Sequence, residues 1–289
     1  GMLDEGTKTR SALAISAEKD KLGANLWSGS GLDICNVRLS ALKENLDESL
    51  ALAADVILNP VFPEDELARL KKQRMAQIRQ EKVRPFSMAL RVFPQLLYGE
   101  NHAYSNPLTG SGTEASTMAM TRKDIADFHK TWLQPNNLTL VVVGDITLEE
   151  LLPKLEKNFS RWNNTATPPV KNIKDMAQAA KSRVFLIDKP GSVQSVLIAG
   201  HLAPPTSNPD EIAIETMNTV LGGSFTSRLN MNLREDKHWS YGARSVFIDA
   251  KGQRMFFAYA PVQTDKTVES LVEINKEMRE ILSSRLPTK

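Results

Sequence analysis

A polar stretch with two adjacent prolines divides this sequence of 289 residues into two parts. The stretch covers residues 164–180, contains Pro168 and Pro169, and shows little apolar periodicity, so it is interpreted as a linker. Its position predicts one domain over residues 1–163 and a second over residues 181–289. Each part is long enough to bury a core of its own.

Both parts contain apolar-alternating runs joined by turn residues, which predict antiparallel strands, and amphipathic runs, which predict helices. The predicted strands cover residues 24–29, 32–42, 138–143, 183–187, 193–199, 245–248 and 255–259. The predicted helices cover residues 7–22, 44–58, 66–81, 85–98, 121–133, 147–159, 209–221, 226–236 and 265–284, with a loop over 99–117. Hairpins followed by groups of helices indicate the α+β class, with a mostly antiparallel sheet in each domain, and not a parallel βαβ sheet.

The composition argues against several classes of protein. The net charge is only +2 and no basic run is interleaved with aromatic residues, which argues against nucleic acid as the main partner. No apolar run reaches the length of a membrane span, and the first residues lack the apolar core of a signal peptide.

The single cysteine, Cys35, lies in an alternating apolar run, which favours a packed strand residue over a nucleophile. The four histidines share no helical spacing suited to a metal.

The stretch Leu221–Phe247 contains the most suggestive pair of side chains. Arg234 closes a predicted helix, and Tyr241 opens a strand predicted to begin near Trp239, seven residues later. A strand that starts where a helix ends can bring a guanidinium and a phenol to one surface, where both can hydrogen-bond the carbonyl oxygens of a peptide. The alternative is a plain helix–strand corner, with Arg234 stabilising the helix dipole and Tyr241 packing as an amphipathic strand residue.

Several segments, in order and spacing, resemble the pitrilysin/insulinase family of peptidases, also called M16. In the first part they are DESLALAADVILNPVFPEDELARLKKQRMAQI, LLYGENHAY, MTRKDIADFHKTWLQPNNLTLVVVGD and LEELLPKLEKNFSRW. In the second part they are SVLIAGH, the helix after Asn208-Pro209-Asp210, and LGGSFTSRLNMNLREDKHWSYGARS. The resemblance covers nearly the whole chain and implies two related α+β domains of the M16 type, both truncated.

The resemblance also implies where a zinc site would fall. Active members of the family carry an inverted H-x-x-E-H motif, whose second histidine is followed by Met-Leu-x-x-Gly-Thr, and a distant glutamate completes the ligand set. The sequence MLDEGT at residues 2–7 has that shape, so Gly1 stands at the second histidine. Gln77 stands at the glutamate position, 76 residues after Gly1, in the family's spacing. A neutral amide is a poor zinc ligand, so we expect no metal and no catalytic residue in this chain alone.

In the family, an arginine and a tyrosine of the last domain contact the substrate near the zinc. Arg234 and Tyr241 match that pattern in residue type and in their interval of seven. The resemblance therefore implies the inactive half of a two-part metallopeptidase, which closes a peptide-binding chamber while a catalytic half or partner with the H-x-x-E-H motif holds zinc. Whether that half is fused or separate stays open. The alternative is a non-enzymatic scaffold subunit of the same fold. A homo-oligomer is a further option, and the bacterial periplasm is the expected location by analogy.

Overall fold

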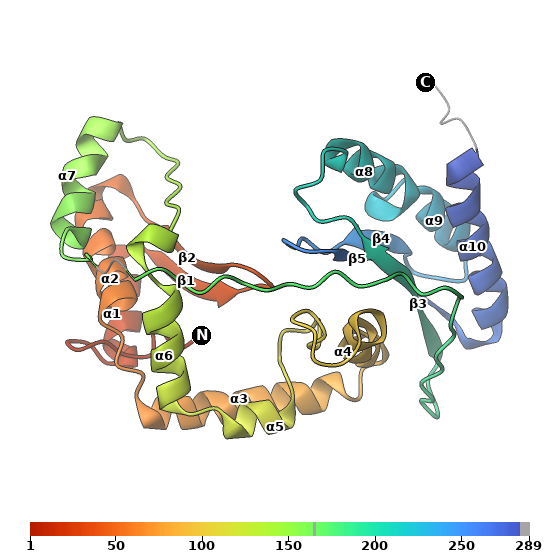
Figure 1. Ribbon diagram of the computed structural model, residues 1–289, viewed down its shortest axis with the longest axis horizontal. Helices are drawn as coiled ribbons and strands as arrows, with labels where there is room; N and C mark the ends of the chain where they lie inside the picture. Colours follow the sequence, from red (N-terminus) through yellow and green to blue (C-terminus); the bar gives the residue numbers. More distant parts are fainter. Residues whose placement is uncertain (164–165, 284–289) are drawn as a thin grey trace. The chain divides into compact units, whose positions relative to one another are not determined.

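The computed structural model describes residues 1–163 and 166–283, which form two compact units (Figure 1). Unit 1 comprises Gly1–Ala76 and Thr113–Asn172. Unit 2 comprises Gln77–Gly112 and the chain from Ile173 onward. Residues 164–165 of the predicted linker and residues 284–289 of the predicted second domain lie outside the described residues. The units differ from the predicted domains chiefly because residues 77–112 pack with the second part of the chain.

Unit 1 is built on a two-stranded antiparallel hairpin covered by helices. Its elements are α1 (Ala12–Leu22), β1 (Asn25–Ser30), β2 (Cys35–Ser40), η1 (Lys43–Asn45), α2 (Leu46–Leu58), the first turns of α3 (Glu64–Glu81), α5 (Glu114–Ala119), α6 (Arg122–Trp132), η2 (Pro135–Asn137) and α7 (Leu148–Phe159). Apolar side chains of α1, β1 and α2, with Ala24 between α1 and β1, form its core, namely Ile15, Leu22, Ala24, Leu26, Leu52, Ala53 and Val56.

Local signals set many helix boundaries in unit 1. Thr121 and Thr147 each accept a hydrogen bond from a backbone N–H three residues on, so each begins its helix as predicted. Thr113 does the same with Ser116 and begins α5, a short helix that starts inside the segment predicted as a loop and ends two residues beyond it. The first predicted helix begins later than expected, at Ala12, because Ser11 is its N-cap and the hydroxyl of Thr7 binds Asp55 instead.

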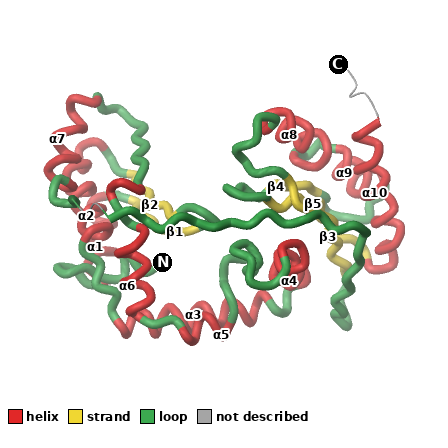
Figure 2. Tube along the Cα trace, viewed as in Figure 1, coloured by secondary structure: helices red, strands yellow, loops and turns green. Residues whose placement is uncertain are grey.

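The predicted central strand over residues 138–143 is wrong. The chain after η2 and before α7 is loop (Figure 2), and its apolar side chains are exposed, up to 93% for Val143. A strand requires a neighbouring backbone that satisfies its N–H and C=O groups. Among the described residues of unit 1, only β1 and β2 form such a ladder. The apolar run therefore has the composition of a strand, but the sequence does not show whether another strand pairs with it.

Unit 2 contains a three-stranded antiparallel sheet in the order β3-β5-β4. Its elements are the end of α3, α4 (Pro85–Tyr98), β3 (Gln194–Ala203), α8 (Glu211–Asn218), the π-helical turn η3 (Thr219–Gly223), α9 (Arg228–Asn230), the π-helical turn η4 (Met231–Asp236), β4 (Arg244–Phe247), β5 (Arg254–Gln263), η5 (Thr264–Lys266) and α10 (Thr267–Ser283). The predicted strand over 183–187 is wrong, because that segment has no regular secondary structure and pairs with no described strand.

The central strand β5 has a helical layer on each face (Figure 1). One face, with Phe256 and Val262, packs against the helices from η3 to α10. On the other face Phe257 contacts Phe93 of α4, with ring centroids 5.5 Å apart. Tyr104 also accepts a hydrogen bond from the backbone N–H of Gly252 (3.1 Å) in the β4–β5 turn. These contacts explain why residues 77–112 belong to unit 2.

The helices and antiparallel sheets confirm the α+β class. None of the described helices is both long and apolar enough to span a membrane.

A buried arginine joins the sheet of unit 2 to the start of α8. The side chain of Arg254 is fully buried, its Nη1 lies 2.8 Å from Oε1 of Glu211, and its guanidinium stacks on Phe247 at 4.7 Å. The hydrogen bond from Arg254 lowers the pKa of Glu211, although burial opposes this shift. A lowered pKa stabilises the fold at pH values above the ordinary value near 4.5, and that contribution is lost as the pH falls through the folded value.

The change Glu211→Gln is expected to lower the free energy of unfolding of the protein by about 3 kcal/mol at pH 7, because it leaves a buried guanidinium poorly compensated. Urea unfolding at pH 7 and at a series of pH values below 4.5 measures this, and the difference between the two proteins should shrink as the pH falls. The neighbouring change Asp210→Asn, at an exposed carboxylate, is the control and should cost under about 0.5 kcal/mol. Equal stability of Glu211→Gln and wild type at pH 7 would contradict a structural role for the pair.

Candidate functional site

Arg234 lies in the π-helical turn Met231–Asp236, which ends at the corner that the sequence predicted. Its guanidinium stacks on the ring of Phe225, with the Cζ atom 4.7 Å from the ring centroid. Its Nε lies 3.3 Å from Oε1 of the adjacent Glu235, an exposed ion pair of little energetic weight. The ring therefore does more than Glu235 to fix the direction of this guanidinium. π-Helical turns are rare and occur often at functional sites.

Tyr241 lies in a bulge, and not in a regular strand. The strand β4 begins only at Arg244, but Ser240 already forms an antiparallel bridge with Val262 of β5. The hydroxyl of Ser240 donates to the carbonyl of Pro261 (2.6 Å) and accepts from the N–H of Gly242 (3.1 Å). Residues 241–243 thus leave the ladder between two paired positions, and the Tyr241 side chain is 87% exposed. Bulges of this kind re-aim a side chain.

The backbone brings the two candidate residues to one corner of unit 2. The carbonyl of Leu233 accepts hydrogen bonds from the N–H groups of Trp239 (3.0 Å) and Ser240 (3.2 Å). Arg234 and Tyr241 are the residues that directly follow Leu233 and Ser240. Among the described residues, no hydrogen bond or ring contact joins the two side chains to each other. The two side chains therefore make no contact of this kind with each other. The Arg234 guanidinium stacks on the Phe225 ring, and the Tyr241 side chain is open to solvent.

Two residues at this corner had no role in the sequence-based prediction. Phe225 supports Arg234, yet nine positions separate them and no periodic pattern links them. Asn230 is buried and donates from Nδ2 to the carbonyl of Phe225 (2.7 Å). Its Oδ1 accepts from the N–H of Ala243 (3.2 Å). A short amide side chain inside a helical run was a detectable signal, because such residues favour bonds to nearby backbone over helix.

Gln77, which the resemblance sets at the position of the family's zinc glutamate, uses its amide as a hydrogen-bond donor. Its Nε2 lies 2.9 Å from Oε1 of Glu81, one helical turn further on. Glu81 is buried and also accepts from Ser111 (2.6 Å) and Arg91 (2.7 Å). The amide of Gln77 is therefore one of several donors around a buried carboxylate.

These donors determine how Glu81 titrates. Burial alone raises the pKa of Glu81, but the hydrogen bonds from Ser111, Arg91, Thr109 and Gln77 together outweigh it and lower the pKa below its ordinary value. A lowered carboxylate pKa means that the cluster stabilises the fold above pH 4.5 and loses this contribution as the pH falls further. A glutamate at position 77 would oppose the charge of Glu81, whereas a glutamine supports it.

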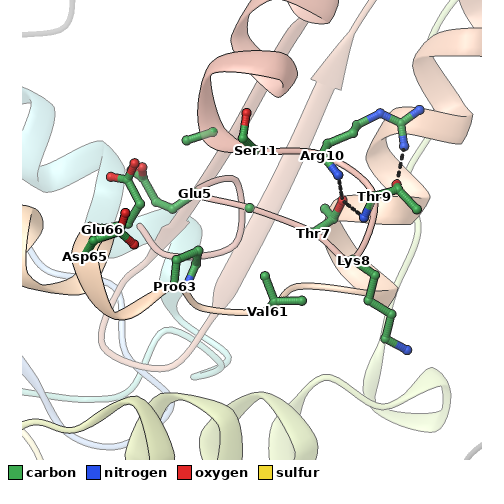
Figure 3. Close-up of a pocket in the computed structure, with 12 residues that line it drawn as sticks. Glu5, Thr7, Lys8, Thr9, Arg10, Ser11, Val61, Pro63, Asp65 and Glu66 are labelled. Atoms are coloured by element: carbon green, nitrogen blue, oxygen red, sulfur yellow. Dashed lines mark hydrogen bonds between the residues drawn. The ribbon is translucent and has the colours of Figure 1, made fainter.

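The motif MLDEGT at residues 2–7 borders a surface pocket of about 370 Å³ in unit 1 (Figure 3). Thr7 is buried at its edge, and its hydroxyl donates to Asp55 (2.7 Å). The same hydroxyl oxygen accepts from the N–H groups of Thr9 (3.3 Å) and Arg10 (3.1 Å), as the dashed lines in Figure 3 show. The threonine of the motif therefore folds the turn before α1.

Gly1 and Gln77, which the resemblance sets at two zinc-ligand positions, do not fit that metal. Gly1 has no side chain, and the amide nitrogen of Gln77 donates to Glu81. Zinc sites in proteins use thiolate, imidazole or carboxylate ligands. Within residues 1–163 and 166–283, no group of three or more His, Cys, Asp or Glu side chains is arranged to hold a metal ion.

The change Gln77→Glu is expected to lower the free energy of unfolding by about 1 kcal/mol at pH 7, because it replaces a donor to Glu81 by a like charge at i,i+4. The loss should shrink as the pH falls below 4.5, because protonation of a carboxylate removes the repulsion. Urea unfolding at both pH values measures the effect. Gln73→Glu is the matched control on the same helix, since the residue one turn on is Gln77. Unchanged stability of Gln77→Glu at pH 7 would show that the amide does not support Glu81.

Comparison with known proteins places this geometry in a family. Among curated relatives, an uncharacterized zinc protease of Mycobacterium leprae, ML0855, is 23% identical over 280 residues, and the zinc protease PqqE of Helicobacter pylori is 24% identical over 271 residues. These alignments cover 94% and 92% of this chain but 61% and 60% of the relatives. The chain thus spans about three fifths of the length of these relatives.

Solved structures with the same fold include two bacterial proteins. The crystal structure of a peptidase M16 inactive domain from Pseudomonas fluorescens superposes with a TM-score of 0.90 at 26% identity, covering 99% of this chain and 68% of that one. A protease from Helicobacter pylori superposes with a TM-score of 0.84 at 21% identity, covering 96% of this chain and 70% of that one.

Two family models match consecutive parts of the sequence. The model described as insulinase (peptidase family M16) matches residues 1–104, and the model described as peptidase M16 inactive domain matches residues 119–289. The second match alone covers more than half of the chain. The chain therefore belongs to peptidase family M16.

Proposed function

We propose that this chain is the non-catalytic half of an M16 metallopeptidase. It closes a peptide-binding chamber and contacts the substrate through Arg234 and Tyr241, while a catalytic half or partner with the H-x-x-E-H motif holds zinc. The match to an inactive domain and the poor fit of Gln77 to zinc support the division of roles. The bacterial periplasm remains our proposal for its location.

The exposure of Tyr241 carries the proposal. In a tyrosine that served only as an amphipathic strand residue, neighbouring side chains would cover the ring and only the hydroxyl would be exposed to solvent. Tyr241 is instead 87% exposed, on a bulge whose backbone is fixed by Ser240. A rigid backbone that presents an uncovered phenol is suited to an external ligand, since the bulge directs the ring away from the core.

The chemistry of the pair suits an extended peptide. A guanidinium offers planar N–H donors and a phenol offers one O–H donor, and peptide carbonyl oxygens accept both. Donors of this kind stabilise a reaction most when negative charge develops on a carbonyl oxygen in the transition state. Stacking on Phe225 orients the guanidinium in advance, so less side-chain entropy is lost when a substrate binds.

The changes Arg234→Ala and Tyr241→Phe test the proposal in the complete protein together with its H-x-x-E-H-bearing half. Each is expected to lower turnover of an internally quenched peptide by about 100-fold, because each removes one donor to the developing oxyanion. The zinc content of the assembly, measured by atomic emission, should stay unchanged. Arg279→Ala, at an exposed arginine of α10, is the matched control and should cleave normally.

Normal cleavage by both variants would leave the corner as a structural feature and favour the scaffold function. Loss of zinc in either variant would mean that the change disturbs assembly and not substrate contact.

A further inference from the structure

We propose that Asn230 is the positioning residue for the Arg234/Tyr241 pair. Its single amide joins the segment that supports Arg234 to the bulge that presents Tyr241. The inference rests on the proposed function of the pair and adds a residue that acts through both members. It follows from contacts inside unit 2 alone.

The nitrogen of the amide holds the Arg234 side of the corner. Asn230 Nδ2 donates to the backbone carbonyl of Phe225 at 2.7 Å. The ring of Phe225 lies against the Arg234 guanidinium at 4.7 Å, although the ring itself is 59% exposed. A ring with so little cover needs its backbone fixed in order to keep one position. The hydrogen bond from Asn230 supplies that fixed point.

The oxygen of the amide holds the Tyr241 side. Asn230 Oδ1 accepts the N–H of Ala243 at 3.2 Å, and Ala243 is itself buried. At the other end of the bulge, the Ser240 hydroxyl donates to the carbonyl of Pro261 in β5 and accepts the N–H of Gly242. The short segment that contains Tyr241 is therefore bound at both of its ends. Without the Asn230 oxygen, the Ala243 N–H would be a buried donor without this partner. The bulge would then lose the hydrogen bond that fixes it at Ala243.

The chemistry of the amide explains why asparagine suits this position. The side chain is 4% exposed, and it uses one N–H and its carbonyl oxygen in opposite directions. Aspartate has the same shape but only acceptors, so it would keep the Ala243 contact and face the Phe225 carbonyl with negative charge. Leucine has similar volume and neither group. Asn230→Asp therefore tests the hydrogen bond to Phe225 alone, and Asn230→Leu removes both hydrogen bonds of the amide.

A double-mutant cycle tests the inference in the complete protein with its H-x-x-E-H-bearing half, using an internally quenched peptide and turnover per folded molecule. Asn230→Asp is expected to lower kcat by about 10-fold with little change in KM, because a displaced donor weakens the transition state more than the ground state. In the background Arg234→Ala/Tyr241→Phe, the same change should cost nothing further, since the groups that it positions are gone.

Hydrogen exchange adds a readout that does not depend on cleavage. The Ala243 amide should exchange about as slowly in Asn230→Asp as in wild type, and clearly faster in Asn230→Leu. Asn218→Asp is the matched control, because Asn218 is also buried, at 7% exposed, but accepts from the hydroxyl of Ser245. It should leave kcat within about twofold.

The outcomes separate the inference from the proposed function. An equal loss of kcat from Asn230→Asp in both backgrounds would overturn the positioning role and leave the Arg/Tyr proposal intact. Unchanged exchange at Ala243 in Asn230→Leu would also overturn it. Normal cleavage by Arg234→Ala/Tyr241→Phe would overturn the proposed function itself, and the positioning role with it.

Discussion

The architecture around the candidate site depends on a close approach between Gly222 and the strand β4. A Cβ atom on Gly222 would lie 2.3 Å from the backbone nitrogen of Ser245, a distance that real Cβ atoms do not show. Only glycine allows the helical layer to come this close to the sheet. Leu221, Leu229 and Leu233 are then buried in the core beside β5. The end of that helical layer, with Arg234, is fixed relative to the sheet as a result.

Irregular backbone, and not regular structure, presents the two candidate side chains. Arg234 lies in a π-helical turn, and Tyr241 lies in a bulge between a bridge at Ser240 and the start of β4 at Arg244. Each irregularity disturbs a regular hydrogen-bond pattern, and side chains such as Ser240 satisfy the groups that are released. Such devices place a side chain outside the core while its backbone stays rigid, which a substrate-contacting residue requires.

The Gln77 cluster shows how an amide supports a buried carboxylate inside the fold. The resemblance implies an acid at this position, but the amide of Gln77 donates to Glu81. Glu81 in turn binds Arg91 and the hydroxyl of Ser111, which joins α3 to the loop before Thr113. An acid at position 77 would repel Glu81. The amide of Gln77 thus supports Glu81 with a hydrogen bond and is itself a poor ligand for zinc.

The sequence by itself determined the class of the fold, most helix boundaries and the corner between Arg234 and Tyr241. Capping residues such as Thr121 and Thr147 act within one turn, so a local pattern is enough to place them. The tertiary structure decided which strands pair, because the apolar run at 138–143 specifies strand-like composition but no neighbour. The tertiary structure also decided that Phe225 and Asn230 lie at the corner with Arg234 and Tyr241. No periodic sequence pattern links these residues, so their contacts depend on how the helices pack on the sheet.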